Sequence, residues 1–133
     1  MAFNLGIELE LPATVSTVMH LLTDAGEIRK WSGGAAILEP QEGGTFSMFD
    51  GWATGTVKKS TATELEYTWR LTEWDEDTAD TTVSFRLQAK GADTLLVLQH
   101  RDLPSREEAD AHKIGWYDYF LVPLEDYIMV LNR

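Results

Sequence analysis

The sequence contains no cysteine, so disulfide bonds, thiolate metal sites and a thiol nucleophile are excluded. Basic residues are scarce as well, with 11 Lys and Arg against 22 Asp and Glu and a net charge of −11. Nucleic acids and anionic membranes are bound through basic patches, so we expect neither as a partner. The chain also has no apolar run of the roughly 20 residues that cross a membrane and no signal-peptide pattern at its start. We therefore expect a cytoplasmic protein.

The sequence does contain enough apolar residues for a substantial core. Hydrophobic residues make up 44% of the 133 residues. A chain of this length buries about two-thirds of the surface that it exposes when unfolded. No internal repeat, linker or low-complexity segment divides it. We expect a single domain over residues 1–133.

The last third of the chain predicts one long amphipathic helix over about 106–131. Ser105 and Glu108 have the spacing of a capping box, in which each side chain bonds the backbone N–H of the other residue. Pro123 lies inside the helix and cannot donate to the carbonyl of Tyr119. We expect it to kink the helix, at a cost of about 3 kcal/mol unless the strain is relieved locally. An apolar stripe recurs every three or four residues at Ala109, His112, Trp116, Phe120, Leu124, Tyr127 and Leu131.

The preceding two-thirds predict strands and turns, with two short helices near the start. Period-two alternation over 3–11 predicts a half-buried strand, and helical spacing over 15–22 and 24–31 predicts the two helices. Further antiparallel strands are predicted around 35–39, 45–49, 52–59, 65–71, 83–87 and 95–99. Gly55, in mid-strand, indicates a bulge or a sharp bend. The element order is β-α-α-β6-α, an α+β fold in which one curved sheet buries its apolar face on the final helix.

Short motifs occur in a fixed order along the chain. They are Pro12, Leu22-Thr23-Asp24, Glu27-Ile28, Trp31, Gly43-Gly44-Thr45-Phe46, Asp50-Gly51-Trp52, Gly55-Thr56-Val57, Tyr67-Thr68-Trp69-Arg70, Thr82-Val83-Ser84-Phe85, Thr94 to His100, Leu103-Pro104 and Gly115-Trp116. In this ordered set the chain resembles the START/Bet v-like (SRPBCC, helix-grip) superfamily. Within it, the chain is most similar to the family of homologues of the activator of the heat-shock-protein-90 ATPase.

The resemblance covers nearly the whole chain and implies a helix-grip fold. In that fold a curved, antiparallel, seven-stranded sheet wraps around a long C-terminal helix, and two short helices after the first strand close one end. The resemblance also implies that Leu96, Leu98 and His100 face inward, which the run 95–99 does not decide because it is apolar on both faces. Two residues depart from the family pattern. Ser32 stands where many relatives have a second Trp, and Pro123 stands where a helix former is usual.

Helix-grip proteins have a cavity between helix and sheet, and the resemblance implies that it is the ligand site. The predicted ligand-binding residues are Trp31, Phe46, Met48, Tyr67, Trp69, Phe85, Leu96, Leu98, His100, His112, Trp116, Phe120 and Leu124. The alternative is that these side chains only pack the core. The number of tryptophans favours a cavity, because Trp is hard to bury completely and its N–H needs a partner. Trp52 follows a turn and is expected to be half-exposed.

His100 and His112 are the candidate polar end of this cavity. His112 lies about 10 Å along the final helix, and His100 lies roughly 16 Å before the helix begins, so the two could meet where the chain doubles back. They would serve as hydrogen-bond partners for a ligand or as an acid/base pair. The alternative is that a neighbouring carbonyl or carboxylate satisfies each of them. His20 lies off the apolar stripe of its helix and is expected at the surface.

Neither a metal site nor a cofactor site is indicated. Two histidines lack a third ligand at a suitable spacing. The acidic loop over 75–80 lacks the Gly and the closing Glu of an EF-hand, so it is expected to be a solvated hairpin loop. The sequence has no Ser-His-Asp set, phosphate loop or nucleotide fingerprint. We therefore expect no metal and no cofactor, and the candidate catalytic residues are only His100 and His112.

Three functions fit this pattern. The favoured one is a non-catalytic protein that binds an apolar, aromatic or polycyclic small molecule in the cavity. The second is suggested by helix-grip relatives that are cyclases, dehydratases or lyases. Such an enzyme would act on a polyketide-like substrate with His100 and His112, and with Tyr67, as acid/base groups. The third is a protein-interaction module with a chaperone partner, like the heat-shock ATPase activator.

Overall fold

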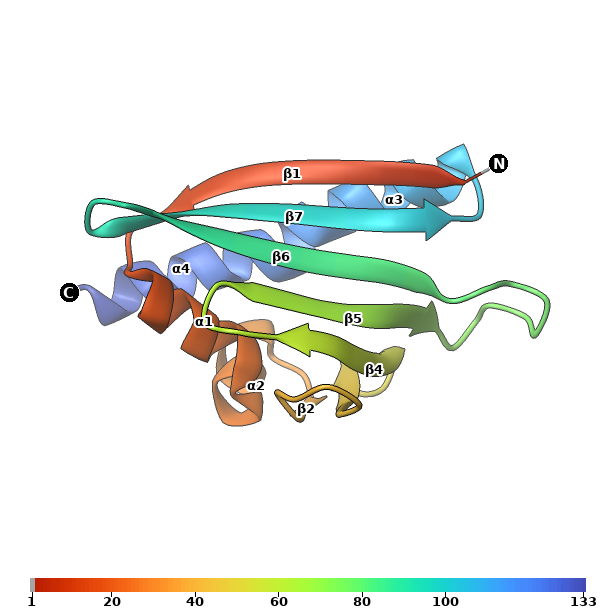
Figure 1. Ribbon diagram of the computed structural model, residues 1–133, viewed down its shortest axis with the longest axis horizontal. Coiled ribbons are helices and arrows are strands. Elements are labelled where there is room, and N and C mark those ends of the chain that lie inside the picture. The colour runs from red at the N-terminus through yellow and green to blue at the C-terminus, as the bar shows by residue number, and fades with distance from the viewer. Residues whose placement is uncertain (1) are drawn as a thin grey trace.

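The computed structural model describes residues 2–133 and shows a curved sheet with a long helix across one face (Figure 1). Within these residues the strands are β1 (Phe3–Leu11), β2 (Ile37–Leu38), β3 (Thr45–Met48), β4 (Ala53–Ser60), β5 (Glu64–Leu71), β6 (Thr81–Lys90) and β7 (Asp93–Leu103). The helical segments are α1 (Val15–Thr23), α2 (Ala25–Ser32), α3 (Arg106–Gly115), η1 (Trp116–Leu121) and α4 (Val122–Leu131). None of these helices is long and apolar enough to span a membrane.

The strands form one seven-stranded antiparallel sheet in the order β1-β7-β6-β5-β4-β3-β2. Strands β2 to β7 make a meander in which each strand pairs with the next. The last strand, β7, also pairs with the first strand, β1, so the first and last strands of the chain lie side by side (Figure 1). The predicted α+β helix-grip architecture is confirmed. The strand predicted over 35–39 is reduced to the two residues of β2.

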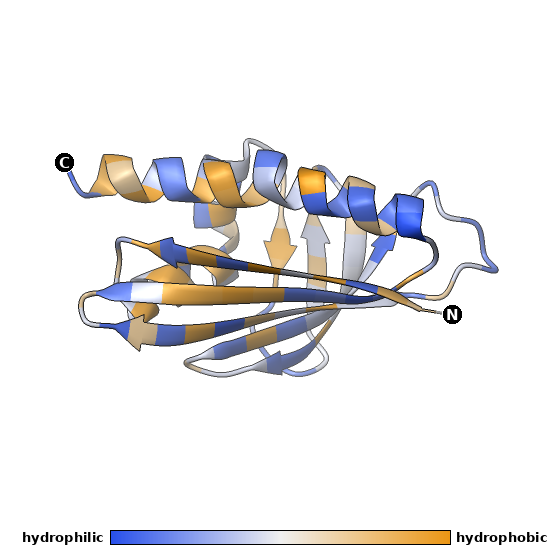
Figure 2. Cartoon of the chain, turned by 90° about the horizontal axis from the view of Figure 1, so that it is seen from above, coloured by the Kyte–Doolittle hydropathy of each residue, from blue (hydrophilic) through white to orange (hydrophobic). Residues whose placement is uncertain are grey.

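Alternation along the strands places the core between the sheet and the final helix. On β5, Leu65, Tyr67, Trp69 and Leu71 are buried, and the residues between them are only half-buried. On β7, buried residues recur at every second position through Leu96, Leu98 and His100, so the inward orientation expected for these three is confirmed. Figure 2 shows the helix lying across the concave side of the curved sheet.

Of the two short helices, α2 packs against the C-terminal helix, and α1 packs against α2 and against strands β6 and β7. Thr14 and Asp24 cap α1 and α2, each accepting a hydrogen bond from a backbone N–H three residues on. The indole of Trp31 donates to the carbonyl of Leu21 at 2.9 Å, and its ring meets the edge of Phe120 with centroids 4.7 Å apart. These contacts fix α2 against η1 and α4 of the long helix.

The C-terminal helix begins where the capping box predicts. The Ser105 hydroxyl accepts a hydrogen bond from the Glu108 N–H at 3.0 Å. Among the described residues, no reciprocal bond from the Glu108 side chain to the Ser105 N–H forms. The Glu108 carboxylate instead lies 3.3 Å from Nδ1 of His112, one turn further on. Only the serine half of the predicted capping box is therefore present.

The strain expected at Pro123 is relieved by a π-helical segment. Just before the proline, the Val122 N–H donates to the carbonyl of Tyr117, five residues back. The extra residue widens the turn, which accommodates both the missing proline donor and the proline ring. Figure 2 shows α3, η1 and α4 running on as one rod, so the expected kink is replaced by this local widening.

The apolar stripe of the C-terminal helix is inward over most of its length. Its members from Ala109 to Leu124 are buried and Tyr127 is half-buried. The prediction that Leu131 belongs to this stripe is wrong. Ile128 is the buried residue in its place, and Leu131 is 51% exposed in a last turn that extends past the packed core.

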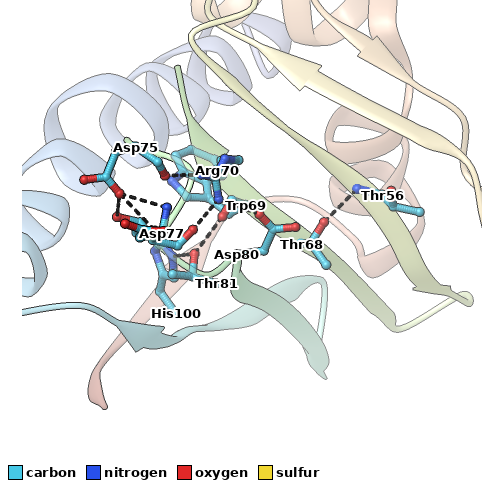
Figure 3. Close-up of polar contacts among 10 residues, drawn as sticks. Thr56, Thr68, Trp69, Arg70, Asp75, Asp77, Asp80, Thr81 and His100 are labelled. Atoms are coloured by element: carbon cyan, nitrogen blue, oxygen red, sulfur yellow. Dashed lines mark hydrogen bonds and ion pairs between the residues drawn. The ribbon is translucent and has the colours of Figure 1, made fainter. Parts of the chain in front are cut away.

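Gly55 is required by a close approach between two strands. A Cβ atom at this position would lie 1.8 Å from the carbonyl oxygen of Thr68 on β5. The bulge that this glycine indicated lies just beyond it, between Val57 and Lys59, where the register of β4 against β5 shifts. The Thr68 hydroxyl accepts from the Thr56 N–H at 2.8 Å, which holds the two backbones together (Figure 3).

We expect the substitution Gly55→Ala to lower the free energy of unfolding by about 3 kcal/mol or more, because the new methyl group overlaps a backbone atom that cannot move away. Gly6→Ala in β1 is the matched control, since its Cβ would meet nothing nearer than 3.8 Å. Chemical denaturation of both variants measures the difference. Equal stability of the two variants would contradict the close approach.

Candidate functional site

A pocket of about 540 Å³ opens between the C-terminal helix and the end of β5, beside the β3–β4 turn. Its sheet side is formed by the β3–β4 turn, the end of β5 and the loop after it, and its helix side by α3 and η1. The lining residues are Phe49, Trp52, Trp69, Leu71, Glu73, Glu108, Ala111, His112, Gly115, Trp116, Tyr119 and Phe120. Six of these twelve residues are Phe, Trp or Tyr, so the pocket is mainly apolar.

The structure brings four of the thirteen predicted ligand-binding residues to this pocket: Trp69, His112, Trp116 and Phe120. The other nine are buried and do not line it. They are Trp31, Phe46, Met48, Tyr67, Phe85, Leu96, Leu98, His100 and Leu124. Tyr67, for example, stacks on Phe46 with centroids 3.8 Å apart, and burial raises the pKa of its phenol, which stays neutral.

Eight pocket residues were not predicted: Phe49, Trp52, Leu71, Glu73, Glu108, Ala111, Gly115 and Tyr119. Some signals were available. Trp52 is 41% exposed, as its place after a turn predicts, and a half-exposed Trp is a natural pocket wall. Tyr119 lies three residues after Trp116, beside it on the same helix face. Nothing in the sequence indicates that Glu73, in a loop, returns to the pocket.

Two tryptophans connect the sheet and the helix beneath the pocket. Trp69 reaches inward from β5, Trp116 is the first residue of η1, and their ring centroids are 4.9 Å apart. The Trp69 indole N–H donates to Nε2 of His112 at 3.1 Å. The Trp116 indole N–H donates to Nδ1 of His100 at 3.1 Å. Each bond joins an element of the sheet to the helix.

The Trp69 bond determines which nitrogen of His112 carries its proton. An indole N–H is only a donor, so Nε2 of His112 must be the acceptor and must carry no proton. The proton therefore lies on Nδ1, which donates to the carbonyl of Glu108 at 2.9 Å. His112 is thus a neutral imidazole with both nitrogens hydrogen-bonded.

The same reasoning gives the opposite tautomer for His100. Its Nδ1 accepts from Trp116, so the proton lies on Nε2, which donates to the hydroxyl of Thr81 at 2.7 Å. That hydroxyl in turn donates to the carbonyl of Trp69 at 3.0 Å (Figure 3). Each N–H and O–H in this series of hydrogen bonds, from Trp116 through His100 and Thr81 to the Trp69 carbonyl, then has an acceptor, as a buried polar network requires.

Both histidines are held neutral by their surroundings. His100 is fully buried, and burial together with the neighbouring His112 lowers its pKa to about 3. Burial also lowers the pKa of His112, against the opposing effect of the Glu108 carbonyl and the Glu108 and Glu73 carboxylates. The two imidazoles lie close, with ring centroids 5.0 Å apart. They meet as the sequence hypothesis requires, but only His112 reaches the pocket.

Arg70 organises the acidic loop over 75–80. Its guanidinium donates to the carbonyls of Asp75 and Thr78 and to the carboxylate of Asp80, the last at 3.0 Å (Figure 3). Asp75 closes the loop further by accepting from the Thr78 N–H and hydroxyl. The acidic loop is therefore an ordered hairpin loop built on an arginine.

At the edge of the pocket, the carboxylate of Glu73 accepts from the indole N–H of Trp52 at 2.7 Å. Trp74, the next residue, packs on the ring of His112 with centroids 5.9 Å apart. Its indole N–H is buried without a hydrogen-bond partner among the described residues.

Residues 2–133 do not bring three His, Asp or Glu side chains together as a metal site.

The sequence itself matches a family model over residues 12–128, that of the activator of Hsp90 ATPase homolog 1-like proteins (AHSA1). This chain belongs to the AHSA1 family. No curated protein sequence matches it significantly.

Solved structures similar to this AHSA1-family chain share its fold over nearly its whole length. An HSP90 activator from Plasmodium falciparum is 25% identical, with a TM-score of 0.86 over 94% of this chain and 95% of that chain. CalU16 from Micromonospora echinospora is 27% identical, with a TM-score of 0.81 over 96% of this chain and 74% of that one. An AHSA1-like protein from Rhizobium etli is 28% identical, with a TM-score of 0.74 over 96% and 82%.

Removing one indole donor tests the hydrogen bonds of this AHSA1-family core. We expect Trp116→Phe to lower the free energy of unfolding by about 2–4 kcal/mol, because it leaves Nδ1 of buried His100 without a donor and loses packing. Trp74→Phe is the matched control, since it deletes an indole N–H that has no partner. We expect that change to cost less than about 1 kcal/mol in a denaturant titration. Equal losses in the two variants would contradict the assigned bonds.

Stability should also depend on pH through the two histidines. The unfolded chain takes up a proton on each imidazole below about pH 6.5, whereas folded His100 stays neutral to about pH 3. The unfolded state therefore binds more protons, and stability falls as pH is lowered. Between pH 7 and pH 5 we expect His100 alone to reduce the free energy of unfolding by about 2 kcal/mol. A free energy that stays constant over this interval would contradict the buried neutral state.

Proposed function

We propose that this protein binds an apolar, aromatic small molecule in the pocket between the C-terminal helix and the sheet. The observation that carries the proposal is the pocket itself. Its volume of about 540 Å³ lies within the range of about 300–1,000 Å³ typical of small-molecule sites. Aromatic rings from both the sheet and the helix line it, and a few polar groups lie at its edge.

The hydrogen bonds of the histidines favour binding over acid/base catalysis. Both nitrogens of His112 and both nitrogens of His100 already have partners within the protein. A general base needs a free lone pair within reach of the substrate. Here the lone pair of each imidazole is taken by an indole N–H, and His100 does not line the pocket. A cyclase, dehydratase or lyase using these two residues is therefore the less favoured function.

The structure allows a direct binding test with a neutral bicyclic probe, 1-naphthylmethanol. We expect its addition to 15N-labelled protein to shift the indole N–H signals of Trp52, Trp69 and Trp116. Trp52→Ala should weaken binding about tenfold, because it removes a large aromatic wall. Ile37→Ala is the control, since Ile37 is also exposed, by 52% against 41% for Trp52, and lies outside the pocket. Shifts that avoid the pocket, or no shifts at all, would contradict the proposal.

Chaperone docking is a second candidate, because a structural neighbour is an HSP90 activator and the family bears that name. One feature of the surface supports it. Ile114, Tyr117 and Val122 are exposed on the C-terminal helix, Ile114 by 63%. Signal changes confined to these three residues when an Hsp90-type chaperone is added to the labelled sample, with none at the pocket when the probe is added, would favour docking over ligand binding.

A further inference from the structure

The charged groups of the pocket are all of one sign. Among its lining residues only Glu73 and Glu108 carry a formal charge, and no Lys or Arg lines it. The two carboxylates come from opposite walls. Glu73 lies in the loop after β5, on the sheet side, and Glu108 lies in the first turn of α3, on the helix side.

Both carboxylates are positioned by contacts within the protein. The Trp52 indole N–H holds Glu73 at 2.7 Å, and the Glu108 carboxylate lies 3.3 Å from Nδ1 of His112. Neither contact neutralises the charge, because an indole is uncharged and the His112 proton is already donated to the Glu108 carbonyl. Neither Glu73 nor Glu108 has a Lys or Arg ion-pair partner within the described chain.

The walls between the carboxylates are aromatic faces. Trp52 and Tyr119 stand at the accessible edge, 41% and 67% exposed, and Trp69 and Trp116 lie buried behind them. Trp and Tyr rings attract a cation placed over their faces, and Trp does so most strongly. An aromatic enclosure edged by carboxylates suits a ligand with an apolar body and a positive charge. It would reject an anion of the same shape.

The rest of the molecule also favours a positively charged ligand. The histidine that lines the pocket is neutral and brings no positive charge of its own. The net charge of −11 also attracts cations and repels anions at a distance. The local lining and the overall field therefore both select a cationic ligand.

We propose, resting on the ligand-binding role proposed for the pocket, that its ligand is an organic cation, an amine with an aromatic or other apolar body. The apolar body lies between Trp52, Trp69 and Tyr119, and the ammonium group lies toward Glu73 and Glu108. The proposal concerns binding alone, and no covalent bond is made or broken.

Three probes with the same ring system separate charge from shape. They are 1-naphthylmethylamine, which is protonated at pH 7, neutral 1-naphthylmethanol, and 1-naphthoate, which is an anion. We expect the amine to bind about tenfold more tightly than the alcohol, and the anion more weakly than both. Only the affinity of the amine should fall steeply with added salt, since screening acts on its charge. Fluorescence of the pocket tryptophans or NMR shifts measure all three affinities.

Two variants assign the selectivity to the carboxylates. Glu73→Gln and Glu108→Gln keep a side-chain oxygen in place and remove the charge. Each should lower the affinity for the amine about three- to tenfold and change the affinity for the uncharged alcohol by much less. Glu107→Gln is the matched control, because it removes the same charge from the same helical turn at a residue that does not line the pocket.

Each outcome of this experiment decides between the two proposals. Preference for the amine that is lost in Glu73→Gln and Glu108→Gln but kept in Glu107→Gln supports the organic cation. Equal binding of the amine and the alcohol would overturn the organic cation while leaving the pocket as a site for apolar molecules. An amine preference that Glu107→Gln weakens as much as Glu108→Gln would also overturn it, because the effect is then only the overall field. Failure of all three probes would overturn both proposals.

Discussion

Two hydrogen bonds, from Trp69 to His112 and from Trp116 to His100, hold the helix on the sheet. The rest of the helix–sheet contact is largely apolar packing, whose driving force is not directional. These bonds are directional, so they fix the rotation of the helix at Trp116 and its position along the sheet. They also require both imidazoles to be neutral and in opposite tautomers. Burial supports the same state by lowering the pKa of both histidines.

The pocket follows from this arrangement. Trp69 and Trp116 are held by their N–H groups, so their rings form a wall of fixed geometry in the interior. The rest of the pocket is built outward from that wall by Trp52, Tyr119 and Glu73. The π-helical segment η1 is part of this arrangement, because it begins at Trp116 and accommodates Pro123, which follows it. Trp69, His112 and Trp116 therefore belong both to the buried core and to the pocket wall.

Most of the fold could be predicted from the sequence, because periodicity and capping are local signals. The alternation on β5, the cap at Ser105 and the ordered family motifs indicated the curved sheet and its helix. The pocket was predicted less well. Inward residues such as Phe46 and Leu98 could equally pack a core or line a cavity, and periodicity does not separate these cases. Glu73 lies at the pocket with its carboxylate bonded to the Trp52 indole N–H, a tertiary contact that no local pattern encodes.

That His100 and His112 lie close together was predictable in outline. Each residue's distance from the start of the C-terminal helix follows from the regular rise of a strand or a helix. Their hydrogen-bond partners were not, because these depend on side-chain directions across the core. The state of these two imidazoles is thus the central claim, and long-range 1H–15N correlation spectra of the histidine side chains test it most directly. At pH 6 we expect His112 to carry its proton on Nδ1 only and His100 on Nε2 only, both neutral. The reverse tautomers, rapid exchange between tautomers, or an imidazolium pattern at either residue would contradict it.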